Sequence, residues 1–173
     1  MRRSIGLLLG VAALTTLAVV AIVAATRLIQ PTVAKGSPVP NIVGTTLDGK
    51  TFDLSSERGH PVVINFWASW CGPCVSELPL LAAMATKHAG DGLAVVGILS
   101  GDNPDAARSF AAAHKATWPT VIDSNGSLKS RFLVPGLPQT FFIDRAGILR
   151  SVQYGEVQEK DFERQYGLIS GGS

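Results

Sequence analysis

The only two cysteines of this chain, Cys71 and Cys74, stand two residues apart. Residues 61–67, just before them, are almost continuously apolar, as a central buried strand is. Residues 71–88 carry apolar side chains at helical spacing. The sequence therefore predicts a pair of cysteines at the point where a buried strand ends and a helix begins.

This position favours redox chemistry at the pair. Unpaired backbone N–H groups and the helix dipole at a helix N-terminus stabilise an anion, so Cys71 is expected to form a thiolate near neutral pH. Lowering its pKa from about 8.5 to about 7 takes only about 2 kcal/mol. Cys74, one helical turn along, can then attack a mixed disulfide and close an intramolecular one. We predict a redox-active disulfide that needs no other cofactor.

Two other interpretations of the pair are a zinc site and an inert structural disulfide. Zinc requires two further Cys or His ligands at suitable spacing, but His60, His88 and His114 are scattered singly, as surface or loop residues would be. No metal site is therefore predicted. An inert structural disulfide remains an alternative, although so short a loop would restrain the unfolded chain very little.

The N-terminus has the features of a signal anchor. Arg2 and Arg3 precede a stretch from Ile5 to Ala25 that contains no charge, and its length as a helix, about 31 Å, is enough to cross a membrane. We predict a transmembrane anchor over residues 1–27, with the N-terminus cytoplasmic and the rest of the chain outside the cytoplasm. Cleavage after Ala25, which would give a secreted protein, is the alternative.

The net charge of +2 and the absence of basic runs beyond the N-terminus argue against a nucleic-acid partner. Residues 28–40 are rich in proline and glycine and are predicted to be a tether. The folded domain is expected over residues 41–168, followed by a C-terminal tail over 169–173. At its start, Asp48-Gly49 between two alternating runs predicts a β-hairpin over residues 41–54.

Strands and helices are expected to alternate along the rest of the domain. Further strands are predicted at 93–99, 120–123, 139–144 and 148–154, and further helices at 104–114, 128–133 and 157–166. Such alternation implies parallel pairing, and the last two strands form a hairpin that adds an antiparallel edge. The fold class is therefore α/β, with a central mixed sheet flanked by helices on both faces.

Two motifs resemble signatures of the thioredoxin superfamily. The first is Phe66–Cys74, with Pro79 five residues after the second cysteine, and the second is Gly136–Asp144. The resemblance implies a thioredoxin-like fold in which Pro138 is a cis-proline whose loop faces the active-site disulfide, with Leu137 just before it.

Finer features resemble one branch of that superfamily. Typical thioredoxins carry a buried Asp where this chain has Asn65, and a Lys where it has Gly97. The stretch from Cys71 to Pro79, the preceding hairpin and the anchor are similar to membrane-anchored extracytoplasmic thioredoxins of the TlpA, ResA and CcmG/DsbE type. The resemblance implies a thiol–disulfide oxidoreductase that reduces disulfides in client proteins, for example apocytochrome c. It also implies a membrane thiol carrier of the CcdA/DsbD type as electron donor.

The resemblance also assigns roles to residues. It implies that Cys71 is the nucleophile, that Cys74 is the resolving thiol and that Glu77, one turn after Cys74, relays its proton. The alternative for Glu77 is an ordinary solvated helix residue. The residues implied in substrate binding are Trp70, Gly72, Pro73, Leu137 and Pro138.

Other functions are compatible with parts of the sequence. An extracytoplasmic oxidase that forms disulfides would use the same pair, although Gly72-Pro73 matches the reducing thioredoxins. A copper-chaperone-like binding module would want a wider cysteine pair and a downstream histidine ligand, and no histidine follows His114. A peroxidase-type protein would share the fold but usually lacks this cysteine spacing.

Overall fold

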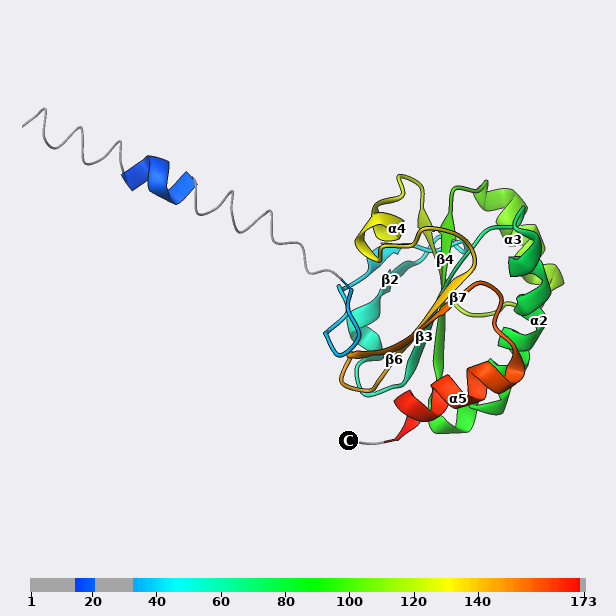
Figure 1. Cartoon of the computed structure of the whole chain (residues 1–173). Helices are drawn as coiled ribbons and strands as arrows, with labels where there is room; N and C mark the ends of the chain where they lie inside the picture. The colour runs from blue at the N-terminus through cyan, green and yellow to red at the C-terminus, as the bar shows by residue number, and fades with distance from the viewer. Residues whose placement is uncertain (1–14, 21–32, 172–173) are drawn as a thin grey trace, which may run out of the picture. The chain divides into compact units, whose positions relative to one another are not determined.

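The computed structural model describes residues 15–20 and 33–171 (Figure 1). The chain divides into two compact units, Met1–Pro31 and Thr32–Ser173. In the first unit residues 15–20 are helical, and none of the helices within the described ranges is long and apolar enough to span a membrane. The predicted anchor over 1–27 lies mostly outside the described residues.

A five-stranded mixed sheet forms the centre of the second unit, in the order β5-β4-β3-β6-β7 (Figure 1). Its strands are β3 (Val62–Trp67), β4 (Ala94–Ser100), β5 (Thr120–Asp123), β6 (Gln139–Ile143) and β7 (Leu149–Tyr154). Strand β3 is buried along its whole length and pairs in parallel with β4 and antiparallel with β6. The mixed sheet confirms the predicted fold class.

Helices cover both faces of the sheet, as Figure 1 shows. The α-helices are α2 (Gly72–Lys87), α3 (Pro104–Ala113), α4 (Ser127–Arg131) and α5 (Glu159–Ser170), and the 3₁₀ helices are η1 (Leu54–Glu57) and η2 (Ala89–Asp91). Phe66 packs into a core with Phe132 at the end of α4, whereas Phe142 packs with Phe162 of α5 in the core on the opposite face. Helices α2, α3 and α5 share that opposite face.

The predicted N-terminal hairpin is confirmed as β1 (Val43–Thr45) paired with β2 (Thr51–Asp53). Gly49 has a φ of +80°, which glycine adopts without steric cost in the turn between the two strands. The N–H of Leu47 donates to the carbonyl of Thr120 at 2.9 Å. The hairpin therefore covers part of the outer edge of β5.

The last residues of the predicted tether over 28–40 are hydrogen-bonded to the folded unit. The N–H of Gly36 donates to the carbonyl of Leu149 at 2.8 Å, and that of Val39 donates to the carbonyl of Gly147 at 3.1 Å. The last residues of the predicted tether thus lie along the start of β7, because this edge strand leaves backbone groups free to pair.

Two expectations near the C-terminus also differ from the structure. The predicted tail over 169–173 begins later, because α5 continues to Ser170 and Ile169 is fully buried in the core. His88, interpreted as a surface or loop residue, is buried. It caps the C-terminus of α2, its ring centroid lies 3.8 Å from that of Tyr166, and its Nε2 is 3.2 Å from Glu163 Oε1.

Candidate active site

Cys71 and Cys74 form a disulfide at the N-terminus of α2, with their Cα atoms 5.2 Å apart. Strand β3 ends at Trp67, and Cys71 is the N-cap residue of α2. The backbone N–H of Cys74 donates to Cys71 Sγ at 3.3 Å. The first cysteine therefore lies where the helix presents free N–H groups, which is the placement that the sequence predicted.

The two cysteines differ in their access to solvent. Cys71 is 5% exposed and Cys74 is 0% exposed, while Gly72 and Pro73 between them are exposed. Both cysteines belong to an apolar cluster against which the half-buried side chain of Leu137 packs. A partner that reaches the disulfide from solvent therefore meets Cys71 first.

The loop before the disulfide is tied to the loop after β4. Trp70 is 65% exposed, and its indole Nε1 donates to the carbonyl of Gly101 at 3.0 Å. The backbone N–H of Ser69 donates to Asp102 Oδ2 at 2.6 Å. An exposed aromatic ring is thus held next to the cysteines. Gly101 and Asp102 were not predicted as site residues, because they follow a strand end as many loop residues do.

The peptide bond between Leu137 and Pro138 is cis, as the resemblance implied. Pro138 is buried, and its carbonyl accepts a hydrogen bond from the N–H of Gly155 at 3.0 Å. Because Leu137 packs on the cluster that contains both cysteines, the fold brings this loop to the disulfide.

Glu77 lies one turn after Cys74 on α2 and is only 1% exposed. Its Oε1 accepts from Asn65 Nδ2 at 2.8 Å, and its Oε2 accepts from the backbone N–H of Val157 at 2.9 Å. The pKa of Glu77 is raised to about 7, mainly by burial and to a smaller extent by the charge of Glu156. The two hydrogen bonds act in the opposite direction and lower it. The alternative of a solvated helix glutamate is therefore wrong.

Asn65 links Glu77 to a third element. Its Nδ2 also donates to Thr140 Oγ1 at 3.0 Å, and in the sheet Asn65 pairs with Gly97 on β4 and with Thr140 on β6. Thr140 and Val157 were not predicted as site residues. Thr140 gave a signal, as a polar residue among the apolar residues of β6, whereas a backbone N–H such as that of Val157 gives none.

The fold and the disulfide define a thioredoxin-like redox protein, and residues 34–167 match the family model described as Redoxin. The chain belongs to the Redoxin family. It is 33% identical over 132 residues to the thiol–disulfide oxidoreductase ResA of Geobacillus kaustophilus, covering 76% of each chain. It is 29% identical over 143 residues to ResA of Bacillus subtilis, covering 83% of this chain and 80% of that one.

Solved structures support the same assignment. A thiol:disulfide interchange protein of the thioredoxin family from Chlorobium tepidum superposes with a TM-score of 0.70 at 28% identity. The match covers 80% of this chain and 99% of that one. The chain is accordingly a thiol–disulfide oxidoreductase of the ResA/DsbE type with a Cys-x-x-Cys redox disulfide.

Proposed function

We propose that this oxidoreductase acts as a reductase of client-protein disulfides, tethered outside the cytoplasmic membrane. One observation carries the proposal. The Cys71–Cys74 disulfide lies at the N-terminus of α2, where Cys71 Sγ already accepts a backbone hydrogen bond. The same environment stabilises the Cys71 thiolate once the pair is reduced.

The reaction starts from the reduced pair. The Cys71 thiolate attacks one sulfur of a client disulfide, which forms a mixed disulfide and releases the first client thiolate. The Cys74 thiolate then attacks Cys71 Sγ, which closes the Cys71–Cys74 disulfide and releases the second client thiolate. Two electrons pass from the pair to the client, and the oxidised pair is the form that the structure contains.

Glu77 serves the second step in this scheme. Cys74 is fully buried, so its thiol needs an internal base before it can attack. Glu77 lies one turn along the same helix and has a pKa of about 7. It accepts the Cys74 proton as the thiolate forms and releases it afterwards.

Client binding is assigned to the surface around Cys71. The exposed Trp70, Gly72 and Pro73 contact the client on one side of the disulfide, and Leu137 and Pro138 line the other. The backbone beside the cis-proline is placed to pair with an extended peptide segment. A client disulfide within an extended segment suits this surface.

The proposed clients are exported proteins with disulfides, including apocytochrome c during its maturation. A membrane thiol carrier of the CcdA/DsbD type supplies electrons to the oxidised pair, because the compartment outside the membrane does not keep thiols reduced. The apolar stretch from Ile5 to Ala25 supports anchoring by residues 1–27.

The reduction potential of the full-length chain in detergent tests the direction of the reaction. The chain is equilibrated with dithiothreitol or glutathione buffers, and the reduced fraction is measured by thiol alkylation. A potential near that of reducing thioredoxins, about −270 mV, supports the reductase. A value near that of strong oxidants, about −120 mV, would make the protein a disulfide-forming oxidase instead.

A trapping experiment tests the cysteine roles and the client. Cys74→Ser removes the resolving thiol, so the variant should accumulate a mixed disulfide between Cys71 and a peptide that carries an oxidised Cys-x-x-Cys-His. Cys71→Ser is the matched control and should trap nothing. Equal trapping by the two variants would contradict the assignment of Cys71 as the nucleophile.

A further inference from the structure

A buried carboxylate on α2 is held by neutral donors from β3 and from the loop before α5. Glu77 on α2 receives one hydrogen bond from Asn65 on β3 and one from the N–H of Val157, which lies between β7 and α5. Both of these groups donate, and a carboxylate accepts. These two hydrogen bonds therefore favour the ionised form of Glu77, against the effect of its burial.

We propose that Asn65 is a positioning residue for the redox reaction, with Thr140 fixing its amide so that both hydrogens are directed to their acceptors. The inference rests on the proposed proton transfer at Glu77. It extends that proposal to residues on β3 and β6, which do not touch the disulfide or the client.

The hydrogen-bond geometry gives the amide one orientation. One hydrogen of Asn65 Nδ2 goes to Glu77 Oε1 at 2.8 Å, and the other goes to Thr140 Oγ1 at 3.0 Å. A flipped amide would direct its carbonyl oxygen at the carboxylate, which repels it. The carboxylate thus selects the donor orientation, and the Thr140 hydroxyl oxygen accepts the second hydrogen and holds the amide in place.

Thr140 also connects this network to the client-binding loop. It follows Pro138 by two residues, and its side chain lies on the same face of the sheet as Asn65, with which it is paired across β3 and β6. The cis-proline segment and the buried carboxylate are thus joined through two side-chain hydrogen bonds. Displacing Thr140 should change the surroundings of Glu77.

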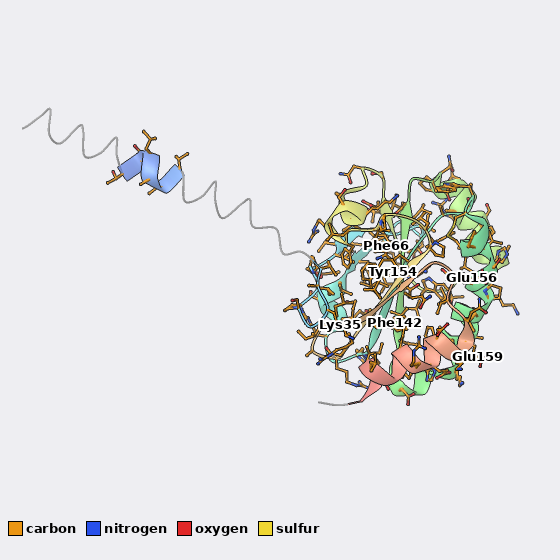
Figure 2. All side chains as sticks on the ribbon, in the orientation of Figure 1. Lys35, Phe66, Phe142, Tyr154, Glu156 and Glu159 are labelled. Atoms are coloured by element: carbon orange, nitrogen blue, oxygen red, sulfur yellow. A yellow bond between two sulfur atoms is a disulfide. The ribbon has the colours of Figure 1, made fainter. Side chains whose placement is uncertain are left out.

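The charges that act on Glu77 are few. Asn65, Thr140 and the Val157 N–H are neutral, and Cys74 on the same helix is neutral while it is in the disulfide. Among the described residues, the charge that acts on Glu77 from outside α2 is that of Glu156, which is exposed in the loop before α5 (Figure 2). A change in the titration of Glu77 on substitution of Asn65 or Thr140 can therefore be attributed to the network itself.

The test is a direct titration of Glu77 in the oxidised full-length chain, labelled with carbon-13 glutamate and kept in detergent. The Glu77 signal is assigned as the one that Glu77→Gln removes. Asn65→Leu, which keeps the volume and removes the donor, should raise the midpoint by about one pH unit, equivalent to about 1.4 kcal/mol. Thr140→Val should raise it by a smaller amount, and Thr140→Ser, which keeps the hydroxyl, should leave it unchanged.

A second readout uses the reduced chain and no client. The pH profile of cysteine alkylation by iodoacetamide should shift in Asn65→Leu relative to wild type. When Asn65→Leu is added to Glu77→Gln, the profile of the double variant should match that of Glu77→Gln alone. An unchanged Glu77 midpoint in Asn65→Leu would overturn the proposal, as would an equal profile shift in the Glu77→Gln background. If Asn65→Leu fails to fold, the Thr140→Val and Thr140→Ser pair decides, and equal midpoints for the two would overturn it.

A failure of the proposed function would look different. In that case the titration and the alkylation profile respond as stated, while the potential excludes a reductase or the trapping experiment contradicts Cys71 as the nucleophile.

Discussion

The buried carboxyl of Glu77 should make the stability of the oxidised protein fall as pH rises. Its pKa is 4.5 when unperturbed and about 7 in the folded chain, mainly because burial disfavours the charge. Between these values the folded state keeps a proton that the unfolded state has lost, so raising the pH favours unfolding. The loss is absent below pH 4.5 and complete above pH about 7, where it amounts to about 3 kcal/mol.

Urea unfolding of the full-length chain in detergent, at several pH values from 4.5 to 8, measures this loss. Glu77→Gln cannot ionise, so its free energy of unfolding should lack the wild-type decline of up to about 1.4 kcal/mol per pH unit. Any cost of placing the Gln amide next to the donors of Asn65 and Val157 is independent of pH, because none of these groups titrates. The difference between the slopes therefore isolates the ionisation of Glu77.

Glu159→Gln, which neutralises an exposed carboxylate in the first turn of α5, is the control and should retain the wild-type slope. Parallel curves for wild type and Glu77→Gln across this pH range would refute the reasoning. They would mean that Glu77 titrates alike in the folded and unfolded chains, in spite of its burial.

Three further changes have defined outcomes. Burial alone would raise the pKa of Asp144, but backbone hydrogen bonds and Arg150 lower it, so Asp144→Asn should cost about 1–3 kcal/mol at pH 7 by urea unfolding. That cost should fade as the pH falls below about 3.8 and through the lower pKa of the folded state. Gly97→Ala would place a Cβ 2.5 Å from a hydroxyl of β5 and should destabilise by about 1–3 kcal/mol, whereas Gly90→Ala, with open space around it, should not. Trp70→Ala should raise KM for a disulfide-containing client peptide and leave the reduction potential unchanged. A shifted potential would mean that Trp70 affects the redox equilibrium of the cysteine pair instead of client binding.

Local sequence signals were sufficient for most of the fold. The apolar run of β3, the Asp48-Gly49 turn of the hairpin and the helix after Cys71 all follow from residues within a few positions of one another. Each of these signals reports a preference of the chain itself, such as alternation, turn chemistry or helical spacing. The elements that depend on them were therefore predicted with nearly correct bounds.

The differences occur where a distant segment decides the outcome. Ile169 is buried only because α5 packs against the sheet, and His88 is buried only because Tyr166 and Glu163 of α5 lie beside it. Gly36 is ordered by the carbonyl of Leu149, more than a hundred positions along the chain. From the sequence alone, Ile169 was assigned to the tail, His88 to the surface or a loop and Gly36 to the tether.

The candidate site divides in the same way. The cysteine pair and its helix were predictable from adjacent residues, but the burial of Glu77 depends on partners 12 and 80 positions away, at Asn65 and Val157. The Val157 contact is made by a backbone N–H, so no residue type in the sequence encodes it. The sequence shows that position 77 is a glutamate, but it does not show that burial raises the pKa of this residue.

The pairing of Asn65 with Glu77 explains why this strand position holds an amide here, when typical thioredoxins have an acid. Two carboxylates at the 2.8 Å separation of Asn65 Nδ2 and Glu77 Oε1 could not both ionise, and the site would titrate as a coupled pair. An amide in the same place donates to the carboxylate and leaves a single ionisable group near neutral pH. With the acid on α2, that group also belongs to the helix that carries Cys74, so in the proposed reaction the proton acceptor and the thiol would keep a fixed spacing of one helical turn.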